Sequence, residues 1–248
     1  MISIRGTGLV SPLGIGVPAH RQSWKSGDSG VDQPTLFDPG SEDARCGEVP
    51  EYDVRSFLRT RQNYLDRNTE LACISVSEAL RGFPDDRDRT GLVVSTIFGN
   101  VETEHLYAEK LLKKGPRFVS PVLFPHTYSN TTISLLAIEY GLGGFHQNFV
   151  SGAAGSISAL ILSCTALECG RCDAVTVCGV EALNRFSYKD MRGMGVKVPA
   201  EGSAAALLCA EGPGNGGTRI SGWAFGRTLD SAIQRSLEKA GMEKETEK

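Results

Sequence analysis

The chain lacks a long apolar run, an excess of one charge and a signal-like N-terminus. None of its 248 residues falls in a stretch approaching the roughly 18 apolar residues that span a bilayer. Lysine and arginine number 26 against 29 acidic residues, so the net charge of −3 indicates neither nucleic acid nor an anionic membrane as a partner. The apolar run in residues 1–5 is too short and wrongly charged for a signal peptide. We therefore expect a soluble, cytoplasmic protein that binds no nucleic acid and no membrane.

Motifs for metals and cofactors are also missing. The seven cysteines are an odd, scattered set, which argues against a disulfide framework and favours a reducing compartment. Cys169 and Cys172 have C-x-x-C spacing, but no second pair accompanies them and no two histidines lie within one helical turn. Gly6-x-Gly8 is a poor dinucleotide-binding fingerprint, and no GxxxxGK[ST] phosphate loop occurs. The sequence thus predicts no metal site and no cofactor.

Apolar stretches of strand and helix length alternate along the chain. Five strands are expected at 2–10, 91–96, 147–151, 174–178 and 204–210, with 218–225 as a further candidate. Helices are expected at 65–80, 102–114, 130–142, 152–168 and 229–240, while 27–53 is typical of a surface excursion. This alternation predicts an α/β fold with a mostly parallel, five-stranded sheet flanked by helices. We expect one domain over residues 1–248, with a frayed tail at 243–248.

The segment 152–168 is small or apolar all the way round. A helix without a polar face is expected to be buried on every side, as the core layer of the domain. The turn before it resembles the geometry that acyl-transfer enzymes use, because the first amides of a buried helix can hold an oxyanion. Ser151 and Ser156 are the hydroxyls there. Neither has a neighbouring histidine, so we interpret Ser151 as a helix cap and Ser156 as a packing residue.

Seven segments, in order, resemble the N-terminal half of the β-ketoacyl synthase family of the thiolase superfamily. The opening Gly6-Thr-Gly-Leu-Val-Ser-Pro-Leu-Gly14 is similar to that family's first strand and turn, and Glu201-Gly-Ser-Ala-Ala-Ala-Leu-Leu208 to its Glu-Gly-Ala-Gly-Ala-Leu strand. The remaining similar segments are 65–67, 115–130, 140–144, 173–182 and 232–242. The resemblance implies half of a thiolase-like fold.

The same resemblance places alanine where the family has its nucleophile. The family's Thr-Ala-Cys falls on Ser151-Gly152-Ala153, and a slip of one residue would give Ala154 instead. A methyl group cannot form a thioester, whatever its surroundings. The family's two active-site histidines and its second oxyanion donor belong to a C-terminal half that would follow residue 248. We expect no catalytic residue here, and a non-catalytic, chain-length-factor-like subunit that cannot condense acyl groups alone.

In that family, N-terminal halves form the dimer interface. The strand expected to pair across the two-fold axis is here Phe145, His146, Gln147, Asn148, Phe149 and Val150. An unpaired strand edge is an aggregation hazard that pairing removes. The expected partner is a full-length ketosynthase, giving a heterodimer, or a second copy, giving a homodimer, in fatty acid or polyketide (including aryl polyene) biosynthesis.

Two further sets of residues follow from the resemblance. Phe124, His126 and Tyr128 are candidates for lining the acyl tunnel of the partner, against ordinary aromatic packing as the simpler interpretation. Arg55, Arg59 and Arg61 are candidate contacts for an acyl carrier protein, although exposed arginines usually have no specific role.

Two alternative functions remain open from the sequence. The chain could be a homodimeric module that binds acyl groups in a leftover pocket. It could also be a thioester enzyme that uses an unrecognised nucleophile, such as Ser151, Ser156 or Cys164. A separately encoded C-terminal half would not restore condensation, because position 153 would still be alanine.

Overall fold

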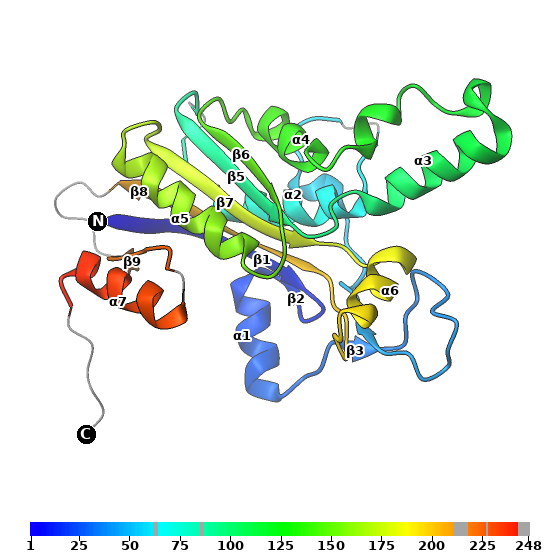
Figure 1. Ribbon diagram of the computed structural model, residues 1–248, viewed down its shortest axis with the longest axis horizontal. Coiled ribbons are helices and arrows are strands. Elements are labelled where there is room, and N and C mark those ends of the chain that lie inside the picture. Colours follow the sequence, from blue (N-terminus) through cyan, green and yellow to red (C-terminus); the bar gives the residue numbers. More distant parts are fainter. Residues whose placement is uncertain (62–63, 85–86, 211–217, 227, 243–248) are drawn as a thin grey trace.

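The fold is seen in a computed structural model that describes residues 1–61, 64–84, 87–210, 218–226 and 228–242. Seven strands of the described residues form one sheet, in the order β2-β1-β8-β7-β5-β6 with β9 beside β1 (Figure 1). Their bounds are β1 Ile2–Ser11, β2 Gly14–Ile15, β5 Thr90–Thr96, β6 His146–Val150, β7 Ala174–Glu181, β8 Gly202–Ala210 and β9 Arg219–Ile220. A separate two-stranded ribbon joins β3 (Val31–Asp32) to β4 (Cys46–Gly47) within the expected surface excursion.

The expectation of a mostly parallel sheet is wrong. Among the seven described strands of this sheet, only β5 forms parallel pairs, with β6 on one side and β7 on the other. β8 runs antiparallel to both β7 and β1, and β1 runs antiparallel to β2 and β9. The five expected strands do form the body of the sheet, and the direction of β8 makes it mixed. Of the candidate strand 218–225, only Arg219–Ile220 pairs with the sheet.

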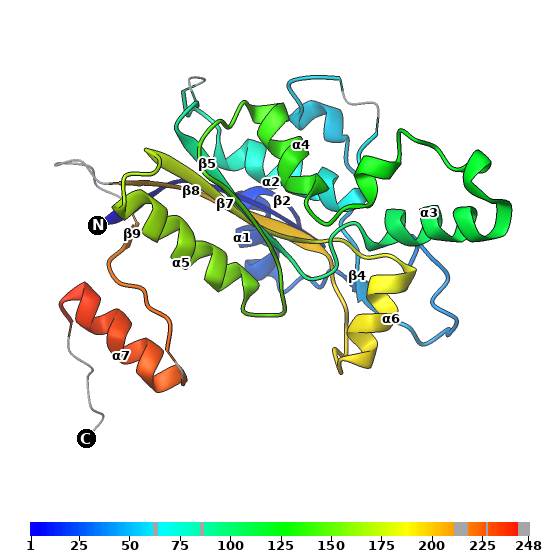
Figure 2. The ribbon, with the colours of Figure 1, turned by 45° about the horizontal axis from the view of Figure 1, so that its top comes forward.

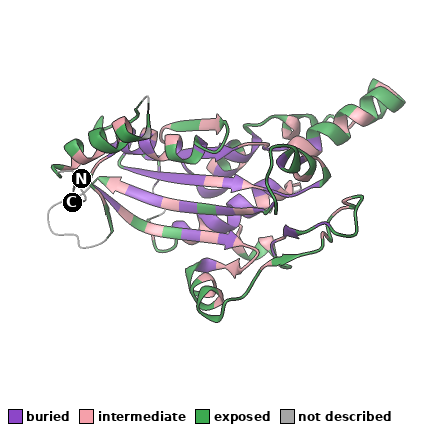
Figure 3. Cartoon of the chain, turned by 60° about the horizontal axis from the view of Figure 1, so that its bottom comes forward, coloured by how far each residue is buried: buried purple, intermediate pink, exposed green. Residues whose placement is uncertain are grey.

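Helices cover both faces of the sheet, as Figures 1 and 2 show. α2 (Arg67–Ala79) and α4 (Thr131–Tyr140) pack on one face, where Leu92 and Val94 of β5 point toward them. α5 (Gly155–Glu168) packs on the other face, against Val93 and Val175. This alternation along β5 follows from the two-residue period of a strand. Figure 3 shows the buried residues concentrated along the sheet between these layers.

The other helices lie around this core. They are α1 Gly16–Ser26, α3 Val101–Lys114, α6 Arg185–Gly193 and α7 Leu229–Ala240, with short 3₁₀ turns η1 Val54–Phe57, η2 Pro116–Phe118 and η3 Phe124–Thr127. α3 and the loop after it project from the body (Figure 1). The sequence patterns predicted α2, α3, α4 and α7 to within about two residues at their ends, but missed α1 and α6. The expected tail at 243–248 lies outside the described residues.

Gly6 and Gly8 of β1 allow α2 to approach the sheet. A Cβ atom on Gly8 would lie 1.8 Å from the carbonyl oxygen of Ser75, and one on Gly6 would lie 1.9 Å from that of Ala79. Both distances are far below van der Waals contact, so only glycine fits at these positions. The Gly-x-Gly pattern therefore serves the packing of a helix on a strand and not the binding of a phosphate.

The helix expected to be buried on every side is buried on one side only. α5 begins at Gly155, and its inner face contributes Ala159 and Cys164 to the core. Its outer face is open: Ile157 is 63% exposed, and Ser156 and Thr165 are exposed as well. The outer face of α5 therefore carries both apolar and polar side chains, and Ser156, Ile157 and Thr165 on it are not covered by other described residues.

None of the helices in the described part of the chain combines the length and the hydropathy that a membrane crossing requires.

Candidate functional site

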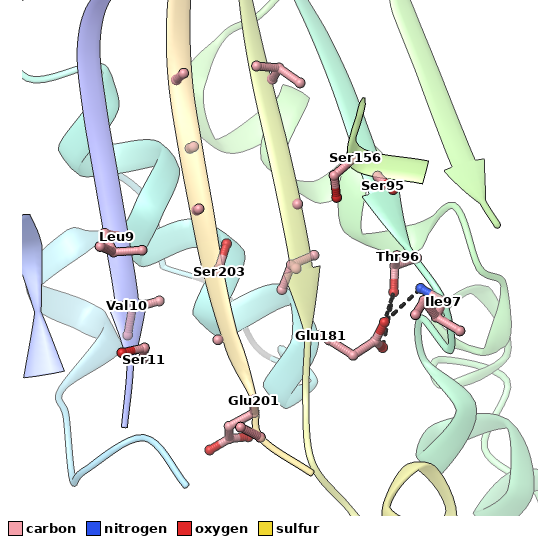
Figure 4. Close-up of a pocket in the computed structure, with 18 of the residues that line it drawn as sticks. Leu9, Val10, Ser11, Ser95, Thr96, Ile97, Ser156, Glu181, Glu201 and Ser203 are labelled. Atoms are coloured by element: carbon pink, nitrogen blue, oxygen red, sulfur yellow. Dashed lines mark hydrogen bonds between the residues drawn. The ribbon is translucent and has the colours of Figure 1, made fainter. Parts of the chain in front are cut away.

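A hollow of about 610 Å³ opens at one end of the sheet (Figure 4). Four strands and one helix meet there: the end of β1, the ends of β5 and β7, the start of β8, and the first turns of α5. Its walls are mostly small or apolar, and they are formed by residues 9–11, 95–97, 152–153, 156, 160, 177, 179–181 and 200–206.

Ala153, the residue at the expected nucleophile position, lines this hollow. It is exposed, and it lies in the turn between β6 and α5. Backbone bonds hold the turn: the Ser151 N–H donates to the Thr96 carbonyl over 3.1 Å, and the Gly155 N–H donates to that of Gly152 over 2.8 Å. The location is one from which a side chain could reach a bound molecule, but a methyl group offers neither a lone pair nor an exchangeable proton.

The interpretation of Ser151 as a helix cap is wrong. The N-cap of α5 is Ala154, and no side chain caps it. The Ser151 Oγ instead lies beside Gly155. A Cβ atom added to Gly155 would come within 2.7 Å of this oxygen. Ser156 is exposed on the first turn of α5, with its Oγ close to Gly179. Within the described residues neither serine forms a hydrogen bond to a histidine, so neither has a base to activate it.

Glu181 forms the polar part of the wall of the hollow. Its carboxylate accepts hydrogen bonds from the Ile97 N–H over 2.7 Å and from the Thr96 hydroxyl over 3.3 Å (Figure 4). It also accepts from the Phe98 N–H over 3.2 Å. Burial disfavours the charged form and raises the pKa of this carboxyl to about 7, although the two amides act in the opposite direction. Glu181 thus ties the end of β7 to the loop after β5.

Glu201 is a second acidic residue of the wall, and its role is structural. Its side chain is fully buried, accepts from the amides of Val49 (2.7 Å) and Leu183 (3.0 Å), and forms a two-pronged ion pair with Arg67 (Nε–Oε2 2.8 Å, Nη2–Oε1 2.5 Å). Its oxygens are occupied by three donor groups from three segments of the chain. The pair therefore holds the start of β8 against the start of α2.

The strand expected to form a dimer interface is an edge strand. Among the described residues β6 pairs only with β5, in parallel register from Leu92↔His146 to Thr96↔Val150. His146, Gln147 and Val150 are exposed, whereas Phe145, Asn148 and Phe149 are half-buried. The outer edge of β6 is thus open to another strand.

The three tunnel candidates lie in the segment that ends at Ser129, the residue that contacts this strand. Phe124 and Tyr128 are 46% and 51% exposed, with ring centroids 5.3 Å apart, and His126 between them in sequence is half-buried. The side-chain amide of Asn148 in β6 donates to the carbonyl of Ser129 over 3.1 Å, which fixes this segment beside the strand. This bond links the segment of the tunnel candidates to one interface candidate, whereas the Phe124 ring contacts Tyr107 of α3 and Tyr128.

The carrier-protein candidates are exposed but lie away from the hollow. Arg55 is part of η1, and its N–H is capped by Asp53 over 3.0 Å. Arg59 and Arg61 follow on the same loop, where the Arg59 N–H donates to Glu139 of α4. None of the three arginines lines the hollow.

No group of three or more potential metal ligands occurs within the described ranges. Cys169 is exposed at the end of α5 and Cys172 is buried.

A Ser11–His20 hydrogen bond at the rim of the hollow escaped the sequence analysis, because nothing in a nine-residue spacing indicates contact. Glu181 was noted only as part of a motif.

Comparisons with known proteins show the family and the fold. The family model described as "Beta-ketoacyl synthase, N-terminal domain" matches residues 1–208. The 3-oxoacyl-[acyl-carrier-protein] synthase 2 of Staphylococcus aureus is 25% identical over 188 residues, covering 73% of this chain and 45% of its own length. The chloroplastic 3-oxoacyl-[acyl-carrier-protein] synthase I of Arabidopsis thaliana is 25% identical over 191 residues, covering 73% and 40%. The chain thus spans less than half the length of these curated relatives.

Two solved structures have the same fold. The ishigamide ketosynthase/chain length factor superposes with a TM-score of 0.79 at 20% identity, over 97% of this chain and 74% of the other. A type II polyketide acyl-carrier protein in complex with its ketosynthase gives a TM-score of 0.79 at 17% identity, over 98% and 70%. The expectation of half a thiolase-like fold is thereby confirmed.

Proposed function

Because the chain belongs to the β-ketoacyl synthase N-terminal domain family, we propose that it is a ketosynthase-like subunit without a condensing nucleophile. It pairs with an active ketosynthase in fatty acid or polyketide assembly and shapes the acyl tunnel of that enzyme. The observation that carries the proposal is Ala153, which lines the hollow at the turn before α5, where the family resemblance places the cysteine.

The open edge of β6 supports pairing with a partner. An edge strand presents unpaired N–H and C=O groups, and a second strand satisfies them while burying the exposed His146, Gln147 and Val150. The side-chain oxygen of Asn148 is itself buried and has no hydrogen-bond partner among the described residues. The feature that favours a contact along β6 is its exposed outer edge.

Co-expression tests the pairing directly. The chain is produced with the full-length ketosynthase encoded nearest to it, and we expect both to co-purify at one-to-one stoichiometry. Val150→Asp places a charge in the contact and is expected to weaken co-purification, because a buried unpaired charge is costly. Leu36→Asp, an exposed apolar residue in the surface excursion, is the matched control and should leave it unchanged. A chain that ignores the ketosynthase contradicts the proposal.

The aromatic pair Phe124 and Tyr128 is proposed to border the acyl tunnel of the partner. Both rings are about half exposed and contact each other, in the segment that Ser129 links to Asn148 of β6. Phe124→Ala and Tyr128→Ala should lengthen the products of the heterodimer, because each removes a ring that limits the tunnel. Phe225→Ala, an equally exposed ring near α7, should not. His126 is placed with them in the same segment, with one ring nitrogen unpartnered.

Contact with an acyl carrier protein is proposed for Arg55, Arg59 and Arg61, which are all exposed. Changing the three together to Ala should weaken carrier binding, and more strongly at low salt because exposed charges are screened. Binding that is insensitive to both the substitutions and the salt concentration would place the carrier elsewhere.

A second candidate is a homodimeric acyl-binding module. The mostly apolar walls of the hollow favour it, since ligand sites are concave and largely apolar. In the co-expression experiment it predicts a homodimer that ignores the ketosynthase and co-purifies with an acyl compound. Mass spectrometry of the purified chain separates the two candidates.

A further inference from the structure

Ser11 and His20 form a hydrogen-bonded pair that the function proposed above does not use. The Ser11 Oγ lies 2.6 Å from Nε2 of His20, and Nδ1 of the same ring lies 2.8 Å from the carbonyl oxygen of Gly16. A carbonyl can only accept, so Nδ1 carries the ring proton and Nε2 accepts from the serine hydroxyl. A hydroxyl, a base and a group that orients the base are thus in line, which is the arrangement of an activated nucleophile.

Local sequence builds this arrangement. β1 and β2 form a tight hairpin in which Ser11 pairs with Gly14. Gly16 then adopts φ +82°, a conformation that favours glycine, and α1 begins there. His20 lies one turn into α1, so its ring returns to the carbonyl four residues earlier. The Leu13 N–H donates to the Ser11 Oγ over 3.2 Å and leaves one lone pair of that oxygen for attack.

The pair joins two hollows. Ser11 lines the hollow of about 610 Å³, whose mostly apolar walls suit an acyl chain. His20 lines a second hollow of about 430 Å³ on α1, together with Val17, Arg21, Trp24 and Lys25.

The residues of the second hollow suit a ligand that carries a phosphate group, here called the phosphorylated handle. Trp24 is 85% exposed, which offers an apolar, aromatic surface. Arg21 and Lys25 are one turn apart on α1 and belong to no ion pair within the described residues. Two such cations beside an aromatic ring suit an anionic group such as a phosphate.

We propose that Ser11 and His20 are an acyl-transfer site for an acyl thioester carried on a phosphorylated handle of the coenzyme A type. The Ser11 Oγ bonds to the acyl carbon while its proton passes to Nε2 of His20. The C–S bond then breaks, and the leaving sulfur takes that proton as a free thiol. Water then attacks the Ser11 ester by the same two steps. This releases a carboxylic acid and restores the Ser11 hydroxyl. This reaction needs neither Ala153 nor a partner chain, so it stands apart from the function proposed above.

The purified full chain is incubated with butyryl-coenzyme A or with p-nitrophenyl butyrate, and acylation is located by peptide mass spectrometry. We expect butyrylation of the peptide that contains Ser11. Ser11→Ala should abolish it, and His20→Gln should slow it at least about 100-fold, as loss of a general base does. Ser26→Ala, another serine near α1, is the control for the hydroxyl. His105→Gln is the control for the base, because Nδ1 of His105 also bonds the carbonyl four residues earlier, over 2.9 Å.

Thermal melting verifies that each variant is folded. If Ser11→Ala does not fold, Ser11→Thr, which keeps a hydroxyl, replaces it in the experiment. Unchanged acylation in Ser11→Ala, or none in the wild-type chain with either substrate, overturns the proposal. The double substitution Arg21→Gln with Lys25→Gln should raise KM for butyryl-coenzyme A several-fold and leave that for p-nitrophenyl butyrate unchanged. An equal effect on both substrates overturns the assignment of the handle.

Discussion

The clearest pH dependence is expected from Glu181. Its pKa is raised from 4.5 to about 7, chiefly because burial disfavours the carboxylate. Between these two values the folded protein holds a proton that the unfolded chain has released. The stability that the group contributes is therefore complete below about pH 4.5 and is lost as the pH rises through 7.

The magnitude follows from the two pKa values. Each pH unit between them corresponds to about 1.4 kcal/mol, so the full interval amounts to about 3 kcal/mol. Between pH 5 and pH 8 the expected loss is about 2 to 3 kcal/mol. Glu181→Gln removes the titration. It also weakens one of the two amide hydrogen bonds, from Ile97 or Phe98, but that cost of about 1 kcal/mol is the same at every pH.

Urea unfolding at pH 5 and pH 8 measures this effect, with the fluorescence of the buried Trp223 as the signal. The wild-type chain should lose about 2 to 3 kcal/mol more than Glu181→Gln over this range. Glu51→Gln, at an exposed position, is the control and should follow the wild type. If Glu181→Gln loses as much free energy of unfolding as the wild type, the carboxyl does not titrate in this window and the reasoning fails.

Three further substitutions, with Gly193→Ala as a control for one of them, test contacts within the fold through the free energy of unfolding. Glu201→Gln should cost about 3 to 5 kcal/mol, because it leaves Arg67 without its ion-pair partner in a largely buried place; a cost below about 1 kcal/mol would contradict this. Gly8→Ala should cost at least about 1 to 3 kcal/mol, since its Cβ would lie 1.8 Å from a carbonyl oxygen of α2. Gly193→Ala, where a Cβ meets nothing within 4 Å, should change stability by no more than about 0.5 kcal/mol, and equal costs for the two would refute the steric argument. Tyr140→Phe should cost about 1 kcal/mol, since the hydroxyl donates to a backbone carbonyl of α2 over 2.9 Å, and a neutral result would mean that this bond contributes nothing.

Helix ends could be read from the sequence because local chemistry determines them. Asp66 caps the start of α2 through its side chain, and Gly115, Gly141 and Gly241 close α3, α4 and α7. Such signals act over three or four residues, so they need no knowledge of the rest of the molecule. α1 escaped detection because its polar sequence has no capping side chain and few buried residues.

Strand direction could not be read in the same way. The segments at β5, β7 and β8 are recognisable as buried strands, but their apolar composition does not distinguish parallel from antiparallel pairing. The path between β7 and β8, which passes through α6, returns the chain in the opposite direction. Burial of α5 depends likewise on what lies beyond it, so its composition alone suggested a cover that the described residues do not provide.

The sequence by itself placed alanine at the expected nucleophile position, because counting from the family motif gives Ala153 and a slip of one residue gives Ala154, also an alanine. It also determined most of the helices and strands, through two- and three-to-four-residue periods and local caps. Only the tertiary structure decided which distant groups meet: Arg67 with Glu201, and Asn148 of β6 with Ser129. The raised pKa of Glu181 depends on burial, and the contact between Ser11 and His20 depends on one hairpin turn. Both are properties of distances in space, which no pattern of neighbouring residues contains.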